Sequence, residues 1–247
     1  LVQRVSGSYR KHYFFPEIAG VGLSYNTFVW KQGMDPRAGM LRLVFGLGTR
    51  AVNRVENDYP RIVALDAPLV KAHHDLNDAR RFSQHDVDML NLEENRFQSL
   101  PLSEVIEAGL EARMELLGIR DFEAMEKMAE MGRPVKDYWI LTFDELLSAT
   151  EFPGVMSRML KTLESVYDYP VDIEFTANFN IEGKLQVNLL QCRPFQTRGQ
   201  QVRMALPESI EDRRVLLRQE GNFMGGSISQ AIYRIIHIDP QGYSKLP

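Results

Sequence analysis

The sequence predicts an α+β domain with a largely antiparallel sheet and packed helices, followed by a short extra segment. Three observations support this fold class. The segment from Val171 to Thr197 alternates apolar and polar residues with the period of a β-strand on both sides of a turn. Segments 103–117, 121–131 and 151–166 carry apolar residues at helical spacing. Hydrophobic residues make up 44% of the 247 residues, enough for a substantial core.

The first part of the chain predicts strands joined by turns. Short strands are expected in LVQRVSG (1–7), in IAGVGLSYN (18–26) and in LRLVF (41–45), where apolar and β-branched residues gather. HDVDMLNLEENRFQSLPL (85–102) predicts two more strands around a turn at Glu93, Glu94 and Asn95.

The middle of the chain predicts three helices and one buried strand. The first helix spans Ser103 to Leu117, with Ser103 as its N-cap. The second spans 121–131 and ends at Gly132 and Pro134. YWILTF (138–143) predicts a buried strand. The third helix begins near Glu151 with a proline in its first turn, and its apolar stripe consists of Phe152, Val155, Met156, Met159, Leu163 and Val166.

The segment after the third helix predicts an amphipathic β-hairpin. Side chains alternate between the faces of a strand, so VDIEFTANF presents Asp172, Glu174 and Thr176 on one face and its apolar residues on the other. In KLQVNLLQCRP the same alternation puts Gln191 and Arg193 on the face of Leu185, Val187 and Leu189.

The register of this hairpin depends on its turn. A reversal at Glu182 and Gly183 would set Glu174 opposite Gln191 and Asp172 opposite Arg193. A longer turn within 180–183 would shift the pairing, so the register stays open. One interpretation is an amphipathic hairpin with a surface ion pair. The alternative is a binding site built from four converging polar groups.

A resemblance favours the binding site. VDIEF followed by LLQCRP resembles the DIE(F/W)…LQ(S/A/T)RP signature of the phosphoenolpyruvate synthase and pyruvate phosphate dikinase family, whose nucleotide-binding domain has the ATP-grasp fold. The resemblance implies that Glu174 and Gln191 hold the Mg²⁺ that bridges the phosphates of ATP. It also implies that Arg193 is a catalytic contact to phosphate, with Asp172 as its orienting neighbour. Mg²⁺ prefers oxygen ligands, and a guanidinium offers phosphate a two-point contact.

Two further segments resemble the same family. IAGVGLSYN is similar to its SGVxFTxNP segment, and VFGLGTRAV is similar to its WGLGExVV pattern. The resemblance implies that Gly46 and Gly48 let the backbone approach ATP. A tight turn is the alternative. The family often has glutamate after GLG, whereas this chain has Thr49 and then Arg50, so Arg50 or Arg54 becomes a candidate phosphate contact.

Composition limits the partners. A net charge of −4 and a pI near 5.8 argue against nucleic acid. The single cysteine, Cys192, excludes an internal disulfide and favours a reducing compartment, so we expect a cytoplasmic protein. No apolar run reaches the roughly 18 residues of a membrane span. His73 and His74 lie near Asp75 and Asp78, but the other histidines lack ligand spacing, which argues against a metal site there.

The predicted organisation is the later part of an ATP-grasp nucleotide-binding domain over residues 1–199, then a linker and the start of a following domain over 200–247. MGGSISQAI is similar to the family's phosphocarrier loop TGGxxSHAA, but Gln230 replaces the histidine, and an amide cannot accept a phosphoryl group. We interpret this match as a chance one, because Gly and Ser are common in turns. We therefore expect the phosphocarrier histidine domain to lie outside this chain.

The resemblance implies a phosphotransferase that moves phosphate from Mg·ATP to that carrier histidine and on to pyruvate. The family's other lobe would precede Leu1, so the isolated chain is expected to be inactive and to bind Mg·ATP weakly. One alternative is a non-catalytic nucleotide-sensing domain with the ATP-grasp fold. Another is a metal hydrolase centred on His73 and His74.

Overall fold

A computed structural model describes residues 5–53, 55–72, 75–110, 113–134, 137–195, 210–217, 223–224 and 231–236. By contact density the chain divides into two units, one of residues 1–196 with 221–223 and one of residues 197–220 with 224–247. The domain boundary at residue 199 stays a prediction. Among the described residues, the structure has no helix long and apolar enough to cross a membrane.

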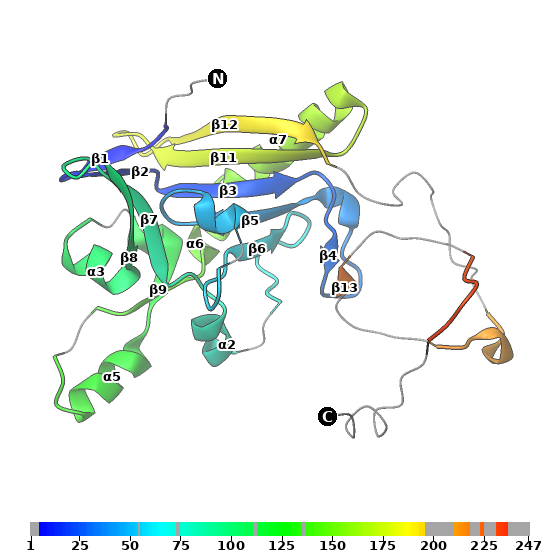
Figure 1. The fold of residues 1–247 in the computed structure, drawn as a ribbon, viewed down its shortest axis with the longest axis horizontal. Helices are drawn as coiled ribbons and strands as arrows, with labels where there is room; N and C mark the ends of the chain where they lie inside the picture. The colour runs from blue at the N-terminus through cyan, green and yellow to red at the C-terminus, as the bar shows by residue number, and fades with distance from the viewer. Residues whose placement is uncertain are drawn as a thin grey trace. The chain divides into compact units, whose positions relative to one another are not determined.

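The described elements are strands and helices in mixed order along the chain (Figure 1). The strands are β1 (Ser8–Arg10), β2 (Tyr13–Phe15), β3 (Ile18–Leu23), β4 (Phe28–Val29), β5 (Met40–Val44), β6 (Arg61–Ala64), β7 (Asp86–Asn91), β8 (Arg96–Pro101), β9 (Gly118–Arg120), β10 (Trp139–Leu141), β11 (Val171–Phe179), β12 (Leu185–Pro194) and β13 (Phe223–Met224). The helices are α1 (Thr49–Val52), α2 (Leu76–Arg81), α3 (Leu102–Glu107), α4 (Met114–Leu117), α5 (Phe122–Glu130), α6 (Asp144–Ala149) and α7 (Phe152–Tyr167), with 3-10 turns η1 (Pro36–Ala38) and η2 (Asp212–Arg214).

A five-stranded sheet with the order β12-β11-β3-β5-β6 organises the larger unit, and its strands lie side by side in Figure 1. Every neighbouring pair in it is antiparallel, which confirms the predicted α+β class. A second sheet, β1-β2-β7-β8, has four strands. The predicted strands in 18–26, 41–45 and 138–143 and the β7–β8 pair are confirmed. Residues 5–7 form no strand, and residues 1–4 lie outside the described part of the chain.

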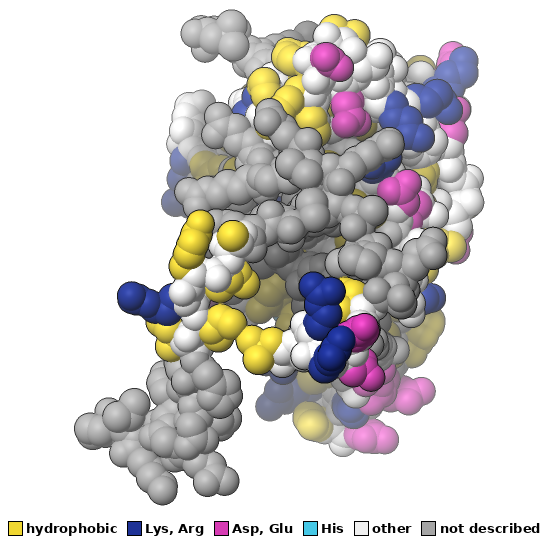
Figure 2. All heavy atoms as spheres, turned by 90° about the vertical axis from the view of Figure 1, so that its right-hand side faces the viewer, with side chains coloured by type: hydrophobic (Ala, Val, Ile, Leu, Met, Phe, Trp, Pro, Cys, Tyr) yellow, Lys and Arg dark blue, Asp and Glu magenta, His cyan; other side chains and the backbone are white. Residues whose placement is uncertain are grey.

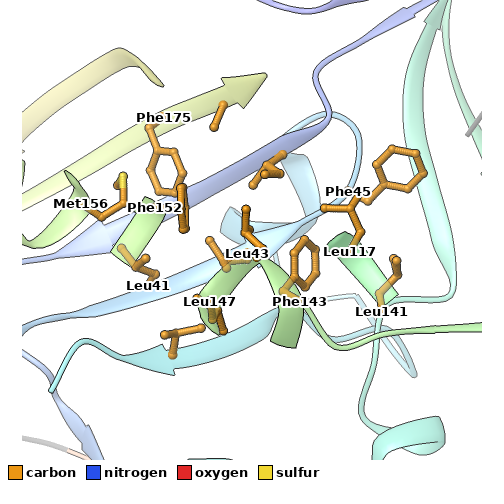
Figure 3. Packing of buried hydrophobic residues seen from close by; sticks show 14 of the residues in the cluster. Leu41, Leu43, Phe45, Leu117, Leu141, Phe143, Leu147, Phe152, Met156 and Phe175 are labelled. Atoms are coloured by element: carbon orange, nitrogen blue, oxygen red, sulfur yellow. The ribbon is translucent and has the colours of Figure 1, made fainter. Parts of the chain in front are cut away.

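One face of the five-stranded sheet carries the main core (Figure 3). Phe152 and Met156 of α7 pack there with Phe175 of β11 and with apolar residues of β5. Glycines in β3 make this packing possible, because a Cβ at Gly20 would lie 2.9 Å from Phe175 Cζ. The other face carries a smaller apolar cluster formed by Ala19, Val21, Leu23, Met40, Val44 and Ala51.

The predicted helix over 103–117 is wrong as one element. It is two helices, α3 and α4, and α3 begins after Pro101 without a side-chain cap from Ser103. The chain turns at Gly109, whose φ of 61° ends the first helix. Leu110, Met114 and Leu117 are nevertheless buried in the core as predicted. Leu110 lies in the loop after α3, whereas Met114 and Leu117 lie in α4.

The second and third predicted helices exist as α5 and α7. Asp121 caps α5 by accepting a hydrogen bond from the backbone N–H of Ala124 at 3.0 Å. The third prediction is wrong at Val166, which is 76% exposed. The sequence analysis predicted no helix at α6, which buries Leu146 and Leu147.

Gly46 connects the two sheets through a close backbone contact. Its φ is 89°, and Leu47 N donates to Asp88 O at 2.9 Å. A Cβ at Gly46 would lie 2.6 Å from Asp88 O. We expect Gly46→Ala to lower the free energy of unfolding by about 1–3 kcal/mol, because the left-handed conformation and the contact both oppose a side chain.

The matched control for this change is Gly48→Ala. Gly48 has a φ of −71°, and the nearest heavy atom to an added Cβ is Ala19 Cβ at 3.5 Å. We expect this change to be neutral or to stabilise by up to about 1 kcal/mol. Urea unfolding of both variants measures the difference, and equal effects would contradict the role given to Gly46.

Candidate functional site

At the end of the β11–β12 hairpin away from its turn, the pairing is the one predicted for a reversal at Glu182 and Gly183. Glu174 pairs with Gln191, and Asp172 pairs with Arg193. Directly paired residues of antiparallel strands present their side chains on the same face, so these four polar groups share one face of the sheet. The predicted adjacency of Glu174 and Gln191 is therefore confirmed.

The turn is longer than a two-residue reversal. Phe179 pairs with Leu185, and between them Asn180 Oδ1 accepts hydrogen bonds from the backbone N–H groups of Glu182 and Lys184. Gly183 occupies the left-handed region with a φ of 78°. This longer loop shifts the pairing by one residue, and a β-bulge restores it between Glu174 and Phe175.

The bulge overturns one sequence prediction. Gln191 and Arg193 do not share a face with Leu185 and Val187 as strict alternation predicted. Leu185 and Val187 pack against the main core together with Cys192, because the extra residue at the bulge reverses the alternation between the two halves of β12. The apolar half of the strand thus faces the core, while its amide and guanidinium face the opposite side.

Glu174 and Gln191 have the chemistry of a magnesium site. A carboxylate and an amide oxygen lie opposite each other, and neither side chain makes a hydrogen bond or ion pair with any residue that the structure describes. Hard cations such as Mg²⁺ take oxygen ligands, usually one or two from protein and the rest from water and phosphate. The residues present therefore fit this ion.

Arg193 is oriented by Asp172. Its Nε and Nη2 atoms both donate to Asp172 Oδ2, at 3.0 Å and 2.8 Å. The Arg193 side chain is 57% exposed, whereas that of Asp172 is 13% exposed. Since a guanidinium has five N–H donors in a planar fork, the edge formed by Nη1 and Nη2 can still donate to a second anion.

Cys192 lies between Gln191 and Arg193 in sequence but points to the core. Desolvation raises the pKa of its thiol, opposed by a hydrogen bond with Tyr167 that lowers it. The thiol is therefore uncharged near neutral pH, and we assign it no nucleophilic role.

Arg50 lies in a buried cluster with aspartates. It is 8% exposed, its Nε donates to Asp88 Oδ1 at 3.0 Å, and its Nη1 contacts Asp58. Asp86 and Ser99 accept from its Nη2 at 3.4 Å and 3.2 Å. This arrangement gives Arg50 a structural role. The involvement of Gly46, Gly48 and Arg50 in ATP binding stays a prediction, and Arg54 lies outside the described residues.

A second polar position on the hairpin's sheet face escaped the sequence prediction. Arg42 of β5 pairs with Val21, and Val21 pairs with Glu174, so Arg42 shares the face of Glu174 and Gln191. The available signal was an arginine inside the apolar strand segment LRLVF. Only the order of the strands shows that this arginine lies on the same sheet face as Glu174 and Gln191.

The remaining predictions about metal and charge concern the rest of the chain. His73, His74 and residues 225–230 with Gln230 lie outside the described residues. Within the described ranges, no group of three or more His, Cys, Asp and Glu side chains is placed to hold a metal ion.

In Figure 2, basic and acidic side chains of the described residues are interspersed over the visible face. A pocket of about 370 Å³ is lined by residues 188–190 of the hairpin together with residues 5–7 and Phe14.

Comparison with known proteins adds one finding. A family model described as the pyruvate phosphate dikinase AMP/ATP-binding domain matches residues 1–214. A search of curated proteins finds no match.

Proposed function

Because the chain belongs to the pyruvate phosphate dikinase AMP/ATP-binding domain family, we propose that it binds Mg·ATP on the sheet face of its β11–β12 hairpin. It is an ATP-grasp-like nucleotide-binding domain of a kinase-type phosphotransferase. In the proposed reaction, phosphate passes from ATP to a carrier histidine outside this chain and then to pyruvate. The cytoplasmic location stays a prediction from the cysteine content.

The observation that carries this proposal is the pairing of Glu174 with Gln191 beside the pairing of Asp172 with Arg193. It supports a division of roles among the four residues. Glu174 and Gln191 would hold Mg²⁺, and when bound this ion would neutralise charge on the phosphates. Asp172 holds one edge of the Arg193 guanidinium, which leaves the other edge for two phosphate oxygens. Positioning and charge neutralisation are the main catalytic contributions in phosphoryl transfer.

A nucleotide sensor that does not transfer phosphate is the second candidate. It is supported by Thr49, which stands where the resembling family often has glutamate and donates its hydroxyl hydrogen bond to Asp88. Isotope exchange between ATP and its products in the full protein separates the two functions. A transferase catalyses this exchange, whereas a sensor binds Mg·ATP without exchange.

Glu174→Gln tests the metal site. Removing the carboxylate should weaken Mg·ATP binding about tenfold, the size of one charge-assisted contact. Binding of ATP without metal should be unchanged or tighter, because the Glu174 carboxylate then repels the phosphates. Calorimetry of the full protein with and without Mg²⁺ measures both affinities.

Glu182→Gln is the matched control for this test. Glu182 lies at the tip of the same hairpin in an exposed ion pair with Lys184, so its replacement makes the same charge change away from the site. We expect both affinities to stay at their original values. A parallel loss of metal-free and Mg²⁺-dependent binding in Glu174→Gln would argue against Glu174 as a metal ligand.

A further inference from the structure

Arg42 lies in the same row of paired residues across the five-stranded sheet as Gln191 and Glu174 of the hairpin. The row runs through successive paired residues Gln191, Glu174, Val21, Arg42 and Ile62. Two strand spacings separate Arg42 from Glu174, which is roughly 10 Å between their backbones. A long guanidinium side chain on β5 and a carboxylate on β11 can therefore approach one ligand from two sides.

Among the described residues, no acidic side chain forms an ion pair with Arg42. Its neighbours on this face are the apolar side chains of Val21, Met40, Val44 and Ile62. Arg42 is half-buried and makes no hydrogen bond or ion pair with the described residues. A partly desolvated cation without a partner raises the free energy of the folded state. An anionic ligand would remove that cost.

Thr176 supplies an independent observation on the same face. Thr176 follows Glu174 by two residues in β11, so both side chains point to the same side. It is 4% exposed, and its Oγ1 has no hydrogen-bond partner in the part of the chain that the structure describes. Buried hydroxyl groups almost always have one. An unpartnered hydroxyl beside Glu174 therefore marks a place where a polar group of a ligand is expected.

We propose that Arg42 is a phosphate contact of the bound nucleotide, and that Thr176 donates a hydrogen bond to the same ligand. This inference rests on the proposed function and adds to it a second cation, on a different strand from Arg193. Arg42 and Arg193 would then bracket the position of Glu174, with positive charge on both sides of the proposed metal ion. A triphosphate is the ligand that matches two separated guanidinium groups and a metal.

Arg42→Gln in the full protein tests this proposal with three probes, Mg·ATP, Mg·tripolyphosphate and adenosine. We expect the affinity for both phosphate-bearing probes to fall by about tenfold to a hundredfold, and the affinity for adenosine to stay unchanged. Arg96→Gln is the control, because Arg96 is an exposed arginine of β8 paired with Glu94 and its loss makes the same charge change. The control should bind all three probes like the original protein.

The Tm of Arg42→Gln distinguishes a ligand contact from a structural role, because loss of a structural arginine would lower the Tm. Because Arg42 has no partner among the described residues, Arg42→Gln should leave the Tm unchanged or raise it while binding is lost. Thr176→Val, which removes only the unpartnered hydroxyl, should likewise keep the Tm and weaken Mg·ATP binding several-fold. A lower Tm with unchanged affinity would overturn the proposal and identify Arg42 as a structural residue.

The outcomes for this inference and for the proposed function are distinct. If the original protein binds Mg·ATP and Arg42→Gln binds it equally well, Arg42 is excluded and the function proposed for the hairpin stands. If the original protein binds neither Mg·ATP nor Mg·tripolyphosphate, both proposals fail. If Arg42→Gln loses adenosine as well as tripolyphosphate, the change acts on the fold of the site, and the phosphate contact is rejected.

Discussion

Arg50→Met is expected to lower the free energy of unfolding by about 3–5 kcal/mol, the cost of breaking a buried charge network by removing one partner. Arg50 is 8% exposed and is the cation between Asp58, Asp86 and Asp88. Without it, Asp58 and Asp88 remain as buried carboxylates with no compensating guanidinium. Methionine retains much of the apolar stem, so the loss reports mainly on charge and hydrogen bonding. Urea unfolding monitored by circular dichroism measures the effect.

Two further variants make this expectation specific. Arg96→Met removes an exposed arginine whose ion pair with Glu94 lies at the surface, so we expect a loss below about 1 kcal/mol. Adding Asp58→Asn to Arg50→Met should recover part of the lost stability, because one uncompensated carboxylate disappears. A small effect of Arg50→Met, equal to that of Arg96→Met, would show that the cluster does not stabilise the fold.

Arg193→Lys is expected to reduce ATP-dependent phosphoryl transfer in the full protein by about tenfold to a hundredfold, with little change in stability. Lysine keeps the charge but has no planar fork, so it cannot contact Asp172 along one edge and phosphate along another. Loss of one charge-assisted contact worth about 1.5–3 kcal/mol gives that range of rates.

A purely structural role for Arg193 predicts a different result. As one half of an exposed ion pair with Asp172, it would contribute under about 1 kcal/mol to stability and nothing to the rate. The matched control is Arg120→Lys, since the Arg120 side chain is 51% exposed and pairs with Asp137. Transfer rates and Tm values of both variants separate the two roles, and an unchanged rate for Arg193→Lys would remove it from the site.

The hairpin shows how far residue patterns alone can reach. Alternation in VDIEFTANF predicts the apolar and polar faces of β11, because the period of a strand depends only on local backbone geometry. The pairing of Glu174 with Gln191 is the one that a two-residue turn would give, but the sequence left the register open, and the structure reaches this pairing through a compensation that the sequence does not reveal. Phe179 pairs with Leu185, so the loop shifts the register by one residue, and the bulge between Glu174 and Phe175 cancels this shift.

Helix boundaries illustrate a second limit. The apolar residues between Ser103 and Leu117 have helical spacing, and most of them are buried, but the chain turns at Gly109 before completing one helix. Apolar residues at helical spacing can also be buried when they belong to two short helices and the turn between them. Spacing therefore identifies which residues enter the core more reliably than it identifies the element that carries them there.

What the sequence by itself determined about this protein is the α+β class, the polar face of β11 and the chemical types at Asp172, Glu174, Gln191 and Arg193. Each of these follows from residue type and from a local period. The tertiary structure alone decided that Arg50 is enclosed by aspartates and that Arg42 shares a face with Glu174. The placement of Arg42 depends on strand order, since β3 lies between β11 and β5 and brings together residues more than a hundred positions apart. The placement of Arg50 depends on the contact of the segment after β5 with β7 of the other sheet. No local period carries that information, because sheet order is set by packing of the whole chain.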